Sequence, residues 1–233
     1  MSTYGRSAFD AAKLAMATER GRSGLFVPFV DLFPVNGAAL SLLGERVGQS
    51  TLSASNPTAA RLDELQFDLG EGPCWEALAS RGPVLAPDID HHDPAAWPTF
   101  SQALHNDEDM PPVGAMFAFP LAVGALDLGA VDLYSHTPTD LSAQQVEDAS
   151  SLASLASIRV LRLVMEASEP GASTEIGTRR EVNQATGMVL AQLGISAEDA
   201  GLLLRAHAFA TGRTVLEVAV DVIDRRLDFS AEE

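Results

Sequence analysis

The spacing of hydrophobic positions changes several times along this chain, and each change predicts the start of a new helix or strand. Apolar side chains at helical spacing predict a first helix over residues 8–19. The apolar run at residues 25–32 fits either a short helix or a loop. Strand-like runs follow at residues 38–43 and 50–55, and the polar segment between them is typical of a hairpin.

The middle of the chain alternates short helices with short strands. The elements we expect there are a helical turn at 61–65, a helix from Pro73, a strand at 83–86, a helix at 97–105, and strands at 114–122 and 129–134. Proline suits the first helical position because its missing N–H would be unpaired there anyway. Strands paired locally, with helices between them, predict an α+β domain in which helices flank an antiparallel sheet.

The most regular helix is expected over residues 142–169, where Ser142 and Gln145 fit a capping box. Its apolar positions then alternate at three and four residues, as in a heptad seam: Val146, Ala149, Ala153, Ala156, Val160, Leu163 and Ala167. The seam could pack against its own sheet. We favour a dimerising helix, with Leu152 and Leu155 off the seam serving the sheet. Pro170 and Gly171 then predict a short linker.

Residues 178–228 predict three short helices joined by two tight turns. Capping-box patterns mark where the helices begin, at Thr178 with Glu181, Ser196 with Asp199, and Thr214 with Glu217. Glycines mark where they end, at Gly194 and Gly212. Turns this short predict a compact three-helix unit.

Composition limits the classes of protein. A hydrophobic fraction of 46% over 233 residues supplies a core for one large or two small domains. The net charge of −17 argues against a general binder of nucleic acids or acidic membranes. From residue 173 onward there are six arginines, no lysine and ten acidic side chains, a net of −4 that leaves −13 for the rest. Binding of a polyanion there would depend on a few placed arginines.

Neither a secretory signal nor a membrane span is expected. Charged residues interrupt the N-terminal apolar positions, and the most apolar window, residues 113–126, is too short to cross a bilayer. We therefore expect a cytoplasmic protein without a membrane partner. Cys74 is the single cysteine, so an internal disulfide is excluded.

Candidate chemistry is sparse. Cys74 follows Pro73 at a predicted helix N-terminus, which can lower a thiol pKa and make a redox-sensing or ligand-contacting group. The alternative is a small packed side chain. The loop containing Asp88, Asp90, His91, His92 and Asp93 has metal-ligand residue types, but its adjacent histidines lack a metal spacing, so we expect a solvated acidic loop and no metal. No hydrolase or phosphate-loop motif is present, so we expect no enzyme. The sequence indicates no particular cofactor.

Residues 183–223 resemble the ANTAR domain, the RNA-binding output module of bacterial transcription antiterminators. The resemblance is carried by Ala185 and Gly187, the Leu193–Gly194 turn, the Leu204–Arg205 pair and the Val218–Ala219 pair. Thr186 stands where members commonly carry lysine. The resemblance implies RNA contacts, for which the chain offers Arg205 and Arg213, then Arg179, Arg180 and His207, and Gln184 and Thr186 as hydrogen-bonding groups.

Residues 25–163 resemble a GAF sensor domain in layout. The resemblance is carried by the run from Leu69 to Leu78, the run from Gly82 to Ile89 and the two strands that follow. It implies a pocket for a small-molecule ligand without identifying that ligand. A phosphorylated receiver domain, the other common companion of ANTAR modules, is not expected because Lys13 is the only lysine.

The sequence therefore predicts an α+β GAF-like sensor domain followed by a small all-α three-helix ANTAR domain. The expected segments are an N-terminal helix (1–24), the sensor domain (25–141), a connecting and dimerising helix (142–169) and the RNA-binding domain (174–233). The expected function is that of a homodimeric, signal-responsive regulator that binds an RNA hairpin loop and controls transcription antitermination. The alternative is a ligand-binding or protein-interaction protein whose C-terminal helices dock a protein partner.

Overall fold

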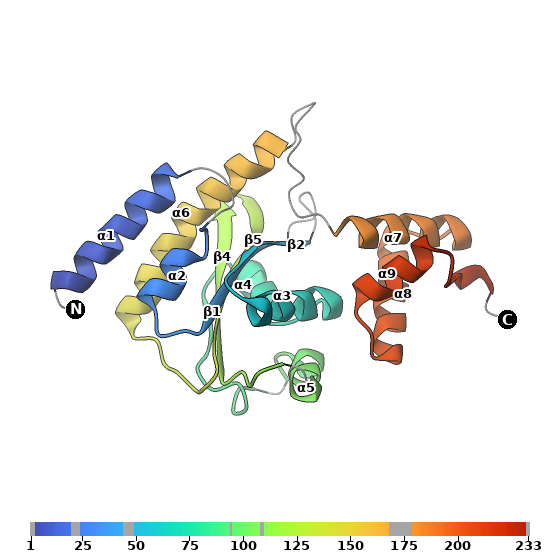
Figure 1. Cartoon of the computed structure of the whole chain (residues 1–233), viewed down its shortest axis with the longest axis horizontal. Coiled ribbons are helices and arrows are strands. Elements are labelled where there is room, and N and C mark those ends of the chain that lie inside the picture. Colours follow the sequence, from blue (N-terminus) through green and yellow to red (C-terminus); the bar gives the residue numbers. More distant parts are fainter. Residues whose placement is uncertain are drawn as a thin grey trace. The chain divides into compact units, whose positions relative to one another are not determined.

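A computed structural model describes residues 3–19, 24–43, 49–93, 95–107, 110–167 and 179–231. The chain divides into two compact units, residues 1–176 and residues 177–233 (Figure 1). Each unit has its own hydrophobic core, so each is described by itself.

Unit 1 contains a five-stranded antiparallel sheet in the order β2-β1-β5-β4-β3. Its elements are α1 (Thr3–Thr18), α2 (Val27–Leu32), β1 (Gly37–Leu42), β2 (Ser50–Ala54), α3 (Pro57–Leu69), α4 (Pro73–Ser80), β3 (Val84–Ala86), α5 (Pro98–Asn106), β4 (Ala115–Val123), β5 (Leu126–Ser135) and α6 (Ala143–Ala167). The α+β prediction, with helices flanking an antiparallel sheet, is confirmed.

Helices cover both faces of this sheet. On β4, Phe117 and Phe119 join the core shared with α1, α2 and α6, whereas Met116 and Ala118 join the core shared with α3 and α5 (Figure 1). Alternate side chains of a strand point to opposite faces. A strand covered on both faces reads as a continuous apolar run, which is the pattern of β1 and β4.

Helix α3 contains the helical turn predicted at residues 61–65 but extends beyond it at both ends. The Asn56 side chain accepts a hydrogen bond from the backbone N–H of Ala59 at 2.9 Å, and Pro57 occupies the first helical position. Gly70, in the left-handed conformation with φ of 68°, ends the helix. The cap, the proline and the terminal glycine enclose a stretch with a weak apolar period. The hydrophobic pattern alone therefore predicted too short a helix.

The heptad seam of α6 faces its own domain. Ala149, Ala153, Ala156, Val160 and Leu163 are buried in the core that α6 shares with the sheet and α1. The expectation that this seam pairs with a second copy is therefore wrong. Small residues at this spacing allow close approach to any packed neighbour, and here the neighbour is the chain's own sheet. The large apolar side chains that α6 leaves exposed are Ile158 and Met165, with 51% and 63% of their surface accessible.

Unit 2 confirms the predicted three-helix unit. It contains α7 (Arg180–Leu193), α8 (Ala197–Thr211), α9 (Val215–Ile223) and a short 3₁₀ helix, η1 (Phe229–Ala231), that was not predicted. Its core is wholly apolar: Ala185, Val189, Ala200, Leu204, Ala208, Val215, Val218, Ala219 and Val222.

The predicted helix caps and terminal glycines of unit 2 are confirmed within the described residues. Thr214 and Glu217 form a full capping box, and the Ser196 hydroxyl accepts a hydrogen bond from the backbone N–H of Asp199 at 3.1 Å. Gly194 and Gly212 end α7 and α8 with positive φ angles of 65° and 64°. The capping box expected at Thr178 lies outside the described residues.

Within the described ranges, no single helix is long and apolar enough to cross a membrane. Taken together, α7 and α8 reach the required length and composition, but they meet at a bend of 108°.

Candidate functional site

One face of α8 combines exposed apolar side chains with a partly exposed arginine. Leu202, Arg205 and Phe209 follow one another at spacings of three and four residues, which places them on one side of the helix. Leu202 and Phe209 have 58% and 61% of their surface accessible. We call these three residues the α8 face. Large exposed apolar groups beside a cation are the usual composition of a binding surface.

Of the four arginines predicted to contact RNA, Arg205 is the one whose surroundings leave it most available. It is partly exposed, and its guanidinium lies back along α8, since a Cβ added to Gly201 would approach Nη1 to 3.5 Å. Within the part of the chain that the structure describes, Arg205 makes no ion pair or hydrogen bond through its side chain. Its donors are therefore open to a ligand.

Arg213 is held by its own unit. Its Nη2 lies 2.7 Å from Oδ2 of Asp221 and donates a hydrogen bond to the backbone carbonyl of Glu217 at 3.1 Å. Arg226 approaches the same carboxylate, with Nε 2.6 Å from Oδ1 of Asp221. Hydrogen bonds from Arg213 and then from Arg226 lower the pKa of Asp221. This arrangement ties the α8–α9 turn to α9, so Arg213 has a structural partner that the sequence did not reveal.

The other predicted RNA-contact residues are spread over the unit. Gln184 is exposed on α7, whereas the Thr186 hydroxyl donates to the carbonyl of Val182 at 2.7 Å and so turns back onto its own helix. His207 packs edge-on against Phe229, with ring centres 5.5 Å apart. Arg179 and Arg180 lie where α7 begins. Their roles in binding remain predictions.

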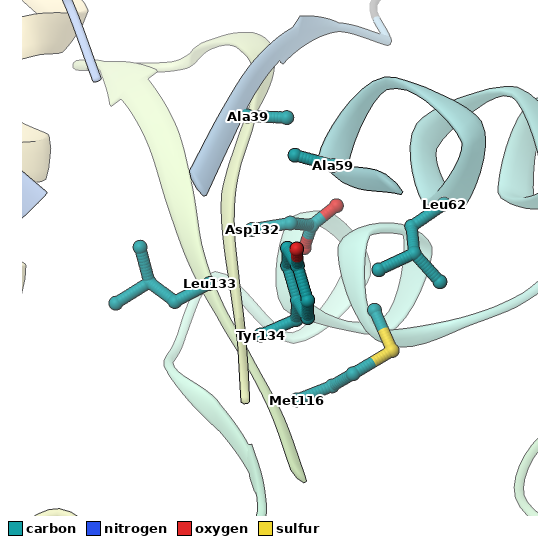
Figure 2. A pocket seen from close by; sticks show the side chains of 7 residues that line it. All are labelled: Ala39, Ala59, Leu62, Met116, Asp132, Leu133 and Tyr134. Atoms are coloured by element: carbon teal, nitrogen blue, oxygen red, sulfur yellow. The ribbon is translucent and has the colours of Figure 1, made fainter. Parts of the chain in front are cut away.

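In unit 1, seven residues line a small space between the sheet and α3: Ala39, Ala59, Leu62, Met116, Asp132, Leu133 and Tyr134 (Figure 2). The space has no room for a water molecule. Asp132 is the one carboxylic acid among the seven, and its carboxyl group points from β5 toward α3 (Figure 2). The sequence analysis did not single out this residue.

Asp132 belongs to a buried polar cluster that also includes Asp63 on α3. The Ser41 and Thr51 hydroxyls donate to Oδ2 of Asp63 at 2.5 and 2.9 Å. The Gln66 side chain donates to Oδ2 of Asp132 at 2.8 Å. Burial raises the pKa of Asp63 to about 6. Burial, and next the charge of Asp63, raises the pKa of Asp132 well above its usual range.

Cys74 lies beside this cluster as a packed thiol. Its backbone N–H donates to Oε1 of Gln66 at 2.9 Å, and its side chain is buried in a cluster with Leu43, Phe67 and Ala130. Burial raises the pKa of the Cys74 thiol well above its usual range, and the nearby carboxyl groups of Asp132 and Asp63 add to this. Of the two readings of Cys74, the geometry fits the small packed side chain, because desolvation outweighs the helix dipole here.

The acidic loop pairs its side chains within itself and with α5. His91 Nδ1 lies 2.9 Å from Oδ2 of Asp88, and His105 Nε2 lies 2.9 Å from Oδ1 of Asp90. His92 stacks on Trp97, with ring centres 4.4 Å apart. Over the residues for which the structure gives positions, no group of three or more histidine, cysteine or carboxylate side chains is arranged to hold a metal ion.

Family comparisons agree with the two units. Residues 20–160 match the GAF domain family, and residues 172–223 match the ANTAR domain. The first match spans more than half of the chain, so the chain belongs to the GAF domain proteins, and it carries a C-terminal ANTAR domain. Unit 1 is therefore a sensor-type domain and unit 2 is an RNA-binding-type domain. No curated protein matches the chain in sequence.

Solved structures show the same fold for unit 1 at low sequence identity. The GAF domain of a phosphoenolpyruvate-protein phosphotransferase from Acinetobacter aligns with a TM-score of 0.56 and 14% identity, over 73% of this chain and 99% of that one. The corresponding domain from Coxiella burnetii gives 0.54 and 11%, over 71% and 97%. The chromophore-binding domain of an R. palustris bacteriophytochrome gives 0.53 and 11%, over 72% and 64%. At these identities the likeness establishes the fold alone.

Proposed function

We propose that this protein is a signal-responsive regulator that binds an RNA hairpin loop through unit 2 and controls transcription antitermination. The supporting observation is the α8 face, which lies within the ANTAR match and presents Arg205 between two exposed apolar side chains. The GAF-like unit senses a small molecule in this proposal, and neither unit acts as an enzyme. A regulator of nascent transcripts works in the cytoplasm.

Two kinds of contact can act together at the α8 face. The guanidinium of Arg205 can pair with phosphate or stack on a base, and the ring of Phe209 offers a face for an unstacked loop base. With a net charge of −4 from residue 173 onward, general attraction to a polyanion is weak. Stacking and hydrogen bonding to loop bases therefore carry much of the affinity, and changes of loop sequence should matter more than added salt.

A titration of the full chain with hairpin RNAs tests this proposal. We expect Arg205→Ala to weaken binding by about tenfold or more, because it removes a charge-assisted contact. Arg225→Ala is the matched control, since Arg225 is an exposed arginine of the same unit that follows α9. Equal losses from the two variants would mean that only total charge matters and would remove the α8 face from the proposal.

Docking of a protein partner is the second candidate, favoured by the exposed leucines and phenylalanine of α8. Phe209→Leu separates the two candidates. Leucine keeps an apolar surface for a protein partner but loses the aromatic ring on which a base can stack. We expect Phe209→Leu to weaken RNA binding and Phe209→Tyr to preserve it. RNA binding that survives Phe209→Leu unchanged would count against base stacking at this position.

We also propose that the protein is a homodimer. Because the α6 seam is buried within unit 1, the pairing surface must differ from the one expected from the sequence, and the exposed side of α6 carries Ile158 and Met165. A charge placed in an apolar contact between copies would split them. We expect Ile158→Glu with Met165→Glu to give a monomer by light scattering, and a dimer that persists would place the contact elsewhere.

A further inference from the structure

Asp63 on α3 and Asp132 on β5, which we call the acid pair, are two buried carboxyl groups held close together: Asp63 accepts from Ser41 on β1, and Gln66, one turn further along α3, donates to Asp132. A hydrogen bond between two carboxyl groups requires a proton on one of them, because an ionised carboxylate only accepts. The Oδ1 atom of each residue meets no N–H or hydroxyl donor in the described residues. A shared proton between the pair accounts for both of these otherwise unsatisfied oxygens.

The surroundings supply hydrogen bonds but no positive charge. Donors reach the pair from β1 through Ser41, from β2 through Thr51 and from α3 through Gln66. Among the described residues, the titratable groups near it are Glu64 on α3, Cys74 on α4 and Tyr134, which lines the same space as Asp132; all three are acids. In the part of the chain described, neither aspartate forms an ion pair with lysine, arginine or histidine. Two like charges this close, without a counter-ion, cannot both ionise at low cost.

We propose that the acid pair is a proton-binding site that holds one proton between α3 and the sheet at neutral pH, and that losing this proton loosens α3 from the sheet. The consequence reaches the space in Figure 2, because Asp132, Ala59 and Leu62 all line it. With the proton bound, α3 closes that space. Without it, repulsion between two carboxylates pushes α3 away and opens the face on which Asp132 lies.

The sign of the pH effect follows from linkage. The folded pair keeps protons that an unfolded aspartate releases near pH 3.8, whereas the pKa of folded Asp63 is about 6. The stabilising contribution is therefore complete below pH 3.8 and declines as pH rises, since the unfolded chain then binds fewer protons than the folded one. Each proton retained by the fold changes the unfolding equilibrium constant by about tenfold per pH unit.

Isosteric amides test this directly. Asp132→Asn can accept from Gln66 and donate to Asp63, so it imitates the protonated pair at every pH. Both tryptophans, Trp75 and Trp97, lie in unit 1, so tryptophan fluorescence of the full chain follows this unit alone. Between pH 5 and 8, the unfolding equilibrium constant of the wild type should change by about tenfold per pH unit. This pH dependence should be absent in Asp132→Asn. Asp31→Asn, on the exposed side of α2, is the control and should behave as wild type.

Two further measurements keep the test decisive if Asp132→Asn folds poorly. Asp63→Asn imitates the same state from the other side and should lose the same pH sensitivity. In the wild type, carbon NMR of the aspartate side chains should show at least one carboxyl group that stays protonated above pH 7. Hydrogen exchange of α3 at pH 8 should be slower in Asp132→Asn than in wild type. Two carboxyl groups that both ionise below pH 5, or pH slopes that match between wild type and both amide variants, would overturn the proposal.

Discussion

The two units of this protein keep their polar chemistry in opposite places. Unit 1 buries it: Asp63, Gln66 and Asp132 lie inside the fold, where each hydrogen bond ties a helix to the sheet. Unit 2 has a wholly apolar core and carries Arg205 and Phe209 on its surface. Buried polar groups can respond to protons or to small ligands, whereas a polyanion needs exposed contacts. This difference agrees with a sensor-type domain in unit 1 and an RNA-binding-type domain in unit 2.

The largest expected effect is a loss of stability in unit 2 that leaves unit 1 unchanged. Leu204 is buried in its core, so Leu204→Ala should lower the free energy of unfolding of that unit by about 2–5 kcal/mol. Leu202→Ala, two residues away and exposed, should change it by less than about 0.5 kcal/mol. Hydrogen exchange of α7–α9 measures the loss. Tryptophan fluorescence should not change, and a shifted fluorescence midpoint would mean that the units do not unfold independently.

The next effect is in the buried network of unit 1. Gln66→Leu removes the donor to Asp132 and the acceptor for the backbone N–H of Cys74. Each group left unsatisfied should cost about 1–3 kcal/mol in the free energy of unfolding. Urea unfolding followed by tryptophan fluorescence measures this cost, with Gln102→Leu on the exposed side of α5 as the control. Equal stability of the two variants would show that the hydrogen bonds of Gln66 do not contribute to the free energy of unfolding.

A smaller effect belongs to the capping box of α9. Thr214→Ala removes the hydroxyl that accepts from the backbone N–H of Glu217, and should lower the stability of unit 2 by about 1 kcal/mol. Thr211→Ala is the matched control, because its hydroxyl donates to carbonyls of its own helix and caps nothing. Hydrogen exchange of α9 distinguishes the two, and identical exchange would contradict the capping role.

Local patterns predicted the elements better than they predicted what those elements contact. The hairpins, the helix from Pro73 and the three C-terminal helices follow from period, caps and turn residues. The surface against which the α6 seam packs could not be predicted in this way, because a stripe of small residues fits a sheet as well as another helix. The acid pair was invisible because Asp63 and Asp132 come together only in the fold. An aspartate within the apolar run of β5 was the one signal that could have indicated it.

The candidate RNA surface was predicted in part. Arg205 was identified from the family resemblance, and the structure leaves its donors available. Arg213 was predicted with equal weight, but its ion pair with Asp221 depends on how the α8–α9 turn folds back. Phe209 was not singled out from the sequence, because the apolar period does not say which side chains of a helix stay exposed; in the structure 61% of its surface is accessible.

The most direct test of the account is crosslinking of the full chain to RNA in cells, followed by sequencing of the RNA and mass spectrometry of the crosslinked peptides. We expect hairpin RNAs, with crosslinks concentrated on peptides of α8 that contain Arg205 or Phe209. We also expect Arg205→Ala to remove most of that signal, whereas Arg225→Ala should not. Recovery of no RNA above background, or crosslinks confined to residues 1–176, would contradict the central claim that unit 2 is an RNA-binding output domain.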